Sequence, residues 1–100
     1  MTVLWMRNAI ENIDSIFEYY YYGVNAELAQ KIKDAIIKRT FQLESNPKLG
    51  QKEKLLLNRR SEYRYLVEGN YKIIYWIDRE FIKIAFVFDT RQNPAKITGI

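Results

Sequence analysis

The sequence predicts a small α+β domain, in which an antiparallel pair of helices packs on one small, mostly antiparallel twisted sheet in the order β-α-α-β-β-β. Two segments, 9–20 and 28–43, repeat apolar residues every three or four positions, as amphipathic helices do. The stretch 63–88 instead holds three runs of aromatic and β-branched residues separated by short turns, which is typical of strands. A chain of 100 residues with 48% hydrophobic content fits a single domain, residues 1–100, with one core.

The chain begins with a short apolar run, Thr2 to Trp5, that predicts a strand. Asn8 follows, and Glu11 lies three residues later, so the pair has the spacing of a capping box at a helix start. The first helix has one apolar face, formed by Ala9, Ile13, Ile16, Phe17 and Tyr20.

Asn25 is predicted to cap a second helix, which ends before Pro47 because the residue before a proline disfavours helical geometry. The connection between the helices is short, so they are expected to form an antiparallel hairpin. Ile32 and Ile36 are expected to be buried against the sheet. They belong to an apolar stripe of Leu28, Ala29, Ile32, Ala35, Ile36 and Leu43.

Residues 48–62 are the least regular part of the chain. Leu49-Gly50 predicts a turn, and Leu55 to Leu57 predicts an apolar anchor in a long loop or a short strand. Residues 48–64 hold six of the 16 basic residues and two of the 12 acidic ones, so the net charge of +4 is concentrated there. Such a segment attracts phosphates or an acidic protein surface, or else it is a solvated loop that keeps the protein soluble.

Three strands are predicted, at 63–68, 71–77 and 81–88. The first hairpin allows two registers. A two-residue loop, Gly69-Asn70, pairs Glu68 with Tyr71 and places Arg64 and Lys72 on opposite faces. A three-residue loop that includes Glu68 places Arg64 and Lys72 on the same face, because a slip of one residue turns every side chain over. The sequence leaves both registers open.

Several kinds of chemistry are excluded by composition. The chain has no cysteine and no histidine, so a disulfide scaffold, a thiolate zinc site and a histidine general base are ruled out, and no metal site or cofactor is predicted. No apolar run approaches the roughly 20 residues that span a bilayer, and the N-terminus lacks a secretory signal. A cytoplasmic protein without a membrane partner is therefore expected. Asp89 is expected to cap the turn after the last strand, the alternative being a catalytic acid or base.

The order of elements and several motifs resemble the RelE/ParE superfamily, the toxins of type II toxin–antitoxin systems. The resemblance covers nearly the whole chain. Its most specific parts are Tyr71 to Tyr75 and the end of the last strand at Arg91; Trp5, Pro47-x-x-Gly50, Arg64 and the run from Val87 to Pro94 also match. It implies two helices on a mostly antiparallel sheet. It also implies growth inhibition, plasmid stabilisation and a cognate antitoxin that is short, acidic and partly disordered when free.

The superfamily has two activities. ParE-like members inhibit DNA gyrase, whereas RelE-like members cut mRNA in the ribosome through basic strand residues and often a C-terminal Tyr or His. Arg64, Lys72 and Arg91 match the basic positions of the cleaving branch, but residues 89–100 contain neither Tyr nor His. The resemblance thus favours a gyrase-type inhibitor, with a ribosome-dependent endoribonuclease as the alternative and a non-toxic RNA-binding relative as a second one. The candidate target- or phosphate-binding residues are Lys52, Lys54, Arg59, Arg60, Arg64, Lys72 and Arg91.

Overall fold

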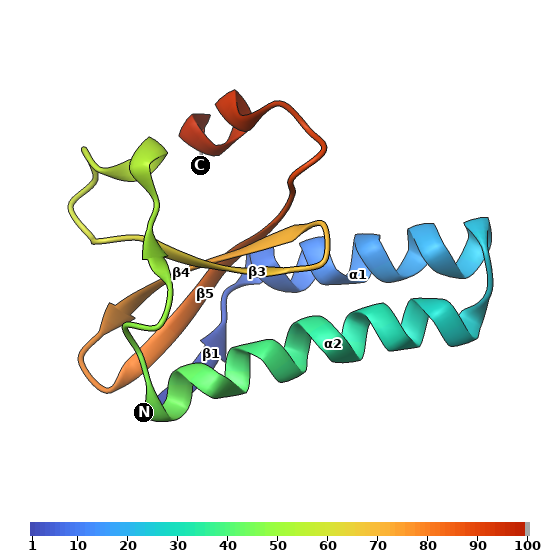
Figure 1. The fold of residues 1–100 in the computed structure, drawn as a ribbon, viewed down its shortest axis with the longest axis horizontal. Helices are drawn as coiled ribbons and strands as arrows, with labels where there is room; N and C mark the ends of the chain where they lie inside the picture. The colour runs from blue at the N-terminus through green and yellow to red at the C-terminus, as the bar shows by residue number, and fades with distance from the viewer. Residues whose placement is uncertain (100) are drawn as a thin grey trace.

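The computed structural model describes residues 1–99 and confirms the predicted α+β class and order of elements (Figure 1). Two short 3₁₀ segments, η1 and η2, and one short strand, β2, accompany the predicted elements. The bounds are β1 (Thr2–Trp5), α1 (Arg7–Gly23), α2 (Ala26–Ser45), β2 (Gln51–Lys52), η1 (Lys54–Leu56), β3 (Arg64–Glu68), β4 (Tyr71–Asp78), β5 (Phe81–Asp89) and η2 (Pro94–Gly99).

The five strands form one sheet in the order β1-β5-β4-β3-β2. β1 pairs with β5 in parallel, and the other three pairings are antiparallel. β1 pairs with only the first half of β5, from Phe81 to Ile84. The second half of β5 therefore has a strand neighbour on one side, and α1 passes along its other side (Figure 1).

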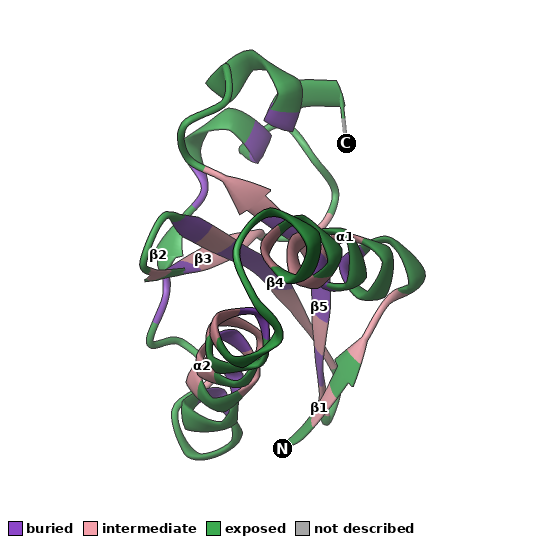
Figure 2. Ribbon diagram, turned by 90° about the vertical axis from the view of Figure 1, so that its right-hand side faces the viewer, coloured by how far each residue is buried: buried purple, intermediate pink, exposed green. Residues whose placement is uncertain are grey.

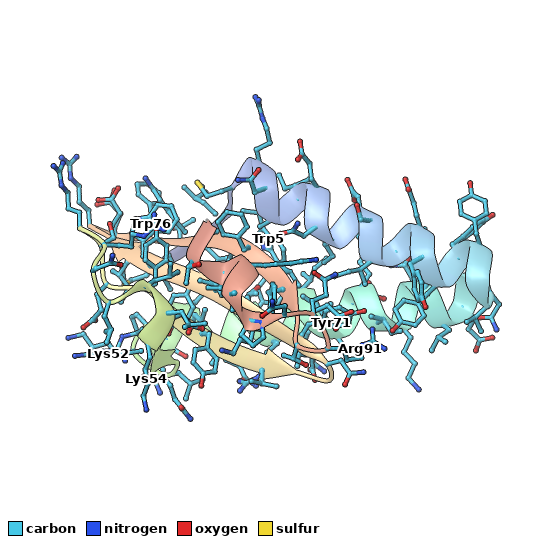
Figure 3. All side chains as sticks on the ribbon, turned by 90° about the horizontal axis from the view of Figure 1, so that it is seen from above. Trp5, Lys52, Lys54, Tyr71, Trp76 and Arg91 are labelled. Atoms are coloured by element: carbon cyan, nitrogen blue, oxygen red, sulfur yellow. The ribbon has the colours of Figure 1, made fainter. Side chains whose placement is uncertain are left out.

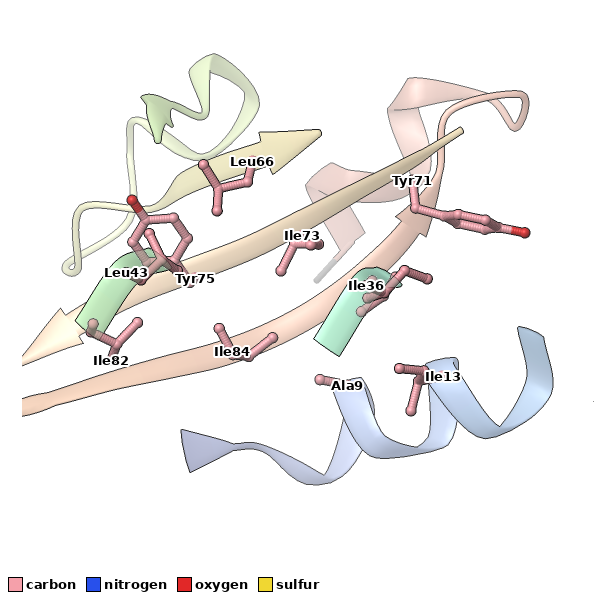
Figure 4. Close-up of a cluster of buried hydrophobic side chains, with 11 residues drawn as sticks. Ala9, Ile13, Ile36, Leu43, Leu66, Tyr71, Ile73, Tyr75, Ile82 and Ile84 are labelled. Carbon is pink, nitrogen blue, oxygen red and sulfur yellow. The ribbon is translucent and has the colours of Figure 1, made fainter. Parts of the chain in front are cut away.

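The helices α1 and α2 pack side by side on one face of the sheet and extend past its end (Figure 1). Their outward sides are exposed (Figure 2). The prediction for Ile36 is confirmed, since it is 1% exposed, whereas Ile32 is only partly buried. Within residues 1–99, neither helix is long and apolar enough to cross a membrane. The main core is aliphatic apart from its tyrosines (Figure 4), with Ala9, Ile13, Ile36, Leu43, Leu66, Ile73, Tyr75, Ile82, Ile84 and Val87 among its buried members.

A second, smaller core lies on the opposite face of the sheet. Leu56 from η1 and Ile97 from η2 pack there against Ile74 of β4. The predicted leucine anchor is thus a single residue, because Leu55 and Leu57 are exposed. The aromatic side chains at its edge are Tyr63, Tyr65, Phe86 and Phe88.

The second helix starts as predicted, but the first does not. The side-chain oxygen of Asn25 accepts a hydrogen bond from the Leu28 backbone N–H at 2.7 Å. Asn8, however, lies inside α1, and Met6 holds the N-cap position without a side-chain cap. The capping box was therefore a wrong prediction. The reason is that the Met6 N–H donates to the Ile84 carbonyl at 2.9 Å, so the β1–β5 pairing runs directly into the helix start.

The first hairpin adopts the two-residue register. Glu68 pairs with Tyr71, and Gly69 has a φ of 57°, a left-handed conformation that glycine adopts without steric cost. Arg64 therefore faces the helices, opposite Tyr75, whereas Lys72 points to the other face, opposite Val67. The second hairpin carries Arg79 at a φ of 57° in its turn.

An irregularity in β5 decides which of its side chains enter the main core. Ile74 pairs with Phe86 and Tyr75 pairs with Ile84, so Ala85 has no partner in the register. This extra residue reverses the alternation of side chains. Ile84 and Val87 consequently both belong to the main core, although they are three residues apart.

Candidate functional site

Arg64 and Tyr75 attach the turn at 47–50 to the sheet. Tyr75 is fully buried; its hydroxyl donates to the Pro47 carbonyl at 2.8 Å and accepts from the Gly50 N–H at 2.9 Å. Burial raises the pKa of this hydroxyl, so it keeps its proton near neutral pH. The Nη1 of Arg64 donates to the Gly50 carbonyl at 2.8 Å, and the side chain is only 15% exposed. Arg64 thus has a structural role in this turn.

Glu62 holds two of the candidate cations. Its Oε2 lies 3.2 Å from the Nη2 of Arg64, and its Oε1 lies 3.1 Å from the Nζ of Lys52. The pKa of Glu62 is lowered mainly by the hydrogen bond from Lys52, with a further contribution from Arg64. The charge of Lys52 is therefore partly compensated, although its side chain is 57% exposed.

Lys72 forms an ion pair with a buried carboxylate, Glu53, whose role no local sequence pattern predicts. Glu53 is 2% exposed; its Oε2 lies 2.9 Å from the Nζ of Lys72, and its Oε1 accepts from the Leu55 N–H at 3.3 Å. The same ammonium lies 4.1 Å from the centre of the Tyr65 ring. In the sequence Glu53 stands between two lysines in a charged segment, a pattern typical of a solvent-exposed residue. Its burial is therefore not predictable from its neighbours along the chain.

Arg91 forms a two-pronged ion pair with Asp89. Its Nε and Nη2 donate to the two carboxylate oxygens at 2.9 and 2.8 Å. Asp89 Oδ1 also accepts from the Arg91 backbone N–H at 2.9 Å, which confirms the predicted turn cap. The side-chain bond from Arg91 lowers the pKa of Asp89, and the same bond raises the pKa of Arg91.

A cavity of about 530 Å³ lies between α1 and the end of β5, and Arg91 forms part of its wall. Tyr71 also lines it, beside Arg91 (Figure 3), and donates to the Tyr20 hydroxyl at 3.3 Å. Burial raises the pKa of Tyr71, so this phenol stays protonated. Asn12 of α1 accepts from the Val87 N–H at 3.0 Å and so caps part of the β5 edge that β1 does not reach. Neither Asn12 nor Glu53 carries a local sequence signal for its role, since each depends on a distant partner.

The candidate cations divide into separate groups. Lys52 and Lys54 lie at one end of the molecule, whereas Tyr71 and Arg91 lie nearer its middle (Figure 3). Lys54, Arg59 and Arg60 are exposed in and after η1. Among residues 1–99, no group of three His, Cys, Asp or Glu side chains could hold a metal ion. The three candidate catalytic cations pair with three different carboxylates, Arg64 with Glu62, Lys72 with Glu53, and Arg91 with Asp89, and Arg64 and Lys72 lie on opposite faces of the sheet.

Comparison with known proteins agrees with this architecture. A family model described as "ParE toxin of type II toxin-antitoxin system, parDE" matches residues 3–94. A solved structure described as "Chromosomal ParDE TA system from P. aeruginosa" superposes with a TM-score of 0.73 at 19% sequence identity, covering 89% of this chain and 95% of that one. At this identity the structural match shows the fold alone. No curated protein matches the chain. Because the family model spans nearly the whole sequence, the chain belongs to the ParE toxin family of type II toxin–antitoxin systems.

Proposed function

We propose that this toxin arrests growth by inhibiting a replication protein such as DNA gyrase, and that it does so without cleaving RNA. The supporting observation is the arrangement of Arg64, Lys72 and Arg91. Each of these cations is within 3.2 Å of a different carboxylate, and Arg64 and Lys72 lie on opposite faces of the sheet. Cleavage through a 2′-hydroxyl needs a base, an acid and a cation around one phosphate, which this arrangement does not favour.

The protonation states of the nearby tyrosines agree with the proposal. A general base is effective when its pKa lies near the working pH. Burial raises the pKa of Tyr71 and of Tyr75, so neither phenol accepts a proton at neutral pH. The Tyr75 hydroxyl moreover both donates and accepts a hydrogen bond in its contacts with the turn at 47–50.

The alternative is a ribosome-dependent endoribonuclease, and one observation favours it. Tyr71 and Arg91 line the same cavity, so a protonated phenol and a guanidinium stand side by side there. The phenol has the protonation state of a general acid, and the guanidinium has the charge that stabilises a transition-state phosphate. A base is still required, and the chain has no histidine to supply it.

We also propose that a short, acidic antitoxin, partly disordered when free, neutralises this toxin. The feature that suits such a partner is the surplus of basic residues in 48–64. A disordered acidic segment can fold across the helices or along a sheet edge while its charges meet this basic surface. Co-purification with the product of the neighbouring reading frame tests this, and the complex should weaken as salt is raised. A tight complex that does not respond to salt would refute the electrostatic part.

The decisive test of the target combines two assays on the parent protein. We expect purified toxin to block DNA supercoiling by gyrase, and primer extension on cellular mRNA after induction to show intact transcripts. Discrete cuts at ribosome-occupied codons that disappear in Arg91→Ala would establish the nuclease instead. By analogy with the loss of one oxyanion-stabilising donor, that change should slow cleavage about 10²–10³-fold. Toxicity with neither signal would refute both targets.

A further inference from the structure

We infer that the loop from Lys54 to Arg60, here called the η1 loop, is the surface that docks on the protein target, and that it fits an acidic patch with an apolar recess. This inference rests on the proposed function, because it assigns a surface to a protein that the toxin inhibits. It is carried by three features of the loop, namely its rigid attachment, its exposed leucines and its uncompensated positive charge.

The loop is held firmly although most of it is exposed. Leu56 is 1% exposed and packs against Ile74 and Ile97. Glu53, at the loop entrance, receives both the Leu55 N–H and the ammonium of Lys72. At the exit, the Nη2 of Arg59 donates to the Thr98 carbonyl of η2 at 2.7 Å. A loop fixed in this way loses little conformational entropy when it binds a partner.

Between these anchors the loop presents two leucines to solvent. Leu57 is 65% exposed and Leu55 is 38% exposed, while Leu56 between them is buried. Leu55 and Leu57, unlike Leu56, therefore contribute little to the core. Exposed apolar side chains on a rigid support are instead what a protein partner can bury in a recess.

The charge around the leucines has one sign. Both acidic residues of the segment are engaged elsewhere, Glu53 with Lys72 below the surface and Glu62 with Lys52 and Arg64. In the described part of the chain, no carboxylate pairs with Lys54, Arg59 or Arg60. The field at the crest of the loop is therefore positive, and it complements an acidic surface.

The chemistry of the crest favours a protein over a nucleic acid. Proteins that bind single strands combine cations with aromatic rings on which bases stack. The nearby rings are partly buried and already engaged within the molecule: the Tyr63 and Trp76 ring centroids lie 5.5 Å apart, and the Lys72 ammonium lies over the Tyr65 ring. Leucine offers no stacking surface, but it fills an apolar recess well.

Two loop variants with matched controls test the inference. The first variant is Lys54→Glu with Arg60→Glu; Arg59 is left intact because it holds η2. Its control is Lys31→Glu with Lys38→Glu, an equal charge change at exposed positions of α2. The second variant is Leu57→Ser, and its control is Val24→Ser, at a residue 58% exposed between the helices. Thermal unfolding should be the same for all four proteins and the parent.

We expect both loop variants to need at least about tenfold more protein than the parent to inhibit supercoiling by purified gyrase, and both controls to match the parent. Loop variants that inhibit gyrase as well as the parent does would overturn the inference and leave the proposed function standing. If the parent itself does not inhibit gyrase, the proposed function fails, and growth arrest decides the inference: arrest lost only in the loop variants supports it, and arrest kept in them overturns it. Binding of the parent to single-stranded RNA or to phosphatidylglycerol vesicles that is lost in the loop variants would also overturn the assignment to a protein.

Discussion

The two faces of the sheet are covered in different ways. The face under α1 and α2 is continuous and mainly aliphatic, with Ile36, Ile73 and Ile84 at 1% exposure or less. The other face is covered by two short 3₁₀ segments, which bury Leu56 and Ile97, and it carries an ion pair between Lys72 and Glu53. We conclude that the helix-covered face supplies most of the stability, while the thin cover on the other face presents cations at the surface.

The largest expected effect is on the helix-covered face. Ile36→Ala should lower the free energy of unfolding by about 2–5 kcal/mol, because a fully buried side chain leaves a cavity in a packed core. Ile32→Ala should cost less, since Ile32 is only partly buried. Urea unfolding followed by circular dichroism measures both changes. Ile10→Ala, at a residue 46% exposed, is the control. Equal midpoints for Ile36→Ala and this control would contradict the assignment of the core.

A smaller loss is expected at the turn that joins α2 to β2. A Cβ added at Gly50 would come within 2.7 Å of the Tyr65 carbonyl oxygen and of the Tyr75 hydroxyl. Gly50→Ala should therefore cost about 1–3 kcal/mol, because the turn must move away from the sheet. Gly23→Ala is the matched control, since nothing lies within 4 Å of an added Cβ there. Thermal unfolding compares the two, and equal melting temperatures would show that the turn adjusts freely.

The ion pair on the other face should contribute less still. Glu53→Gln removes the charge that holds Lys72 and should cost about 1–2 kcal/mol, toward the lower end of what hydrogen bonds to charged groups contribute, because the Lys72 side chain is 22% exposed. Hydrogen exchange at the Leu55 and Leu56 amides should become faster, as the loop entrance loosens. Glu80→Gln, at an exposed residue in the β4–β5 turn, is the control. Unchanged exchange at both amides would mean that Leu56 alone anchors the loop.

The smallest effect concerns acid stability at the end of β5. In the folded state the pKa of Asp89 lies below its ordinary value of 3.8, chiefly because of the hydrogen bond from Arg91. Asp89 therefore stabilises the fold above its unfolded pKa, and this contribution is lost as the pH falls through the lower folded-state pKa. Asp89→Asn should cost less than about 1 kcal/mol at pH 7, because solvent screens the pair. The difference from the parent should vanish at strongly acidic pH. A constant difference across the acid range would indicate a loss of turn geometry instead of charge.

Local patterns predicted much of the molecule. The two helices, the Asn25 cap and the turn cap at Asp89 depend on residues within a few positions, so propensity and spacing were sufficient. The capping box at Asn8 had the same kind of local support and was wrong. A bond from Met6 to Ile84, on a strand far along the chain, sets that helix start. Even local signals are thus overridden where a helix begins against a sheet.

The sequence by itself determined the α+β class, the order of the elements and the concentration of positive charge in residues 48–64. Only the tertiary structure decided that Arg64 serves the turn at Gly50, that Lys72 pairs with the buried Glu53, and that the unpaired residue Ala85 shifts the faces of β5. The physical reason is distance along the chain. Helix periodicity and composition are set by near neighbours, whereas an ion pair between residues 19 positions apart forms only when the register of several strands brings them together.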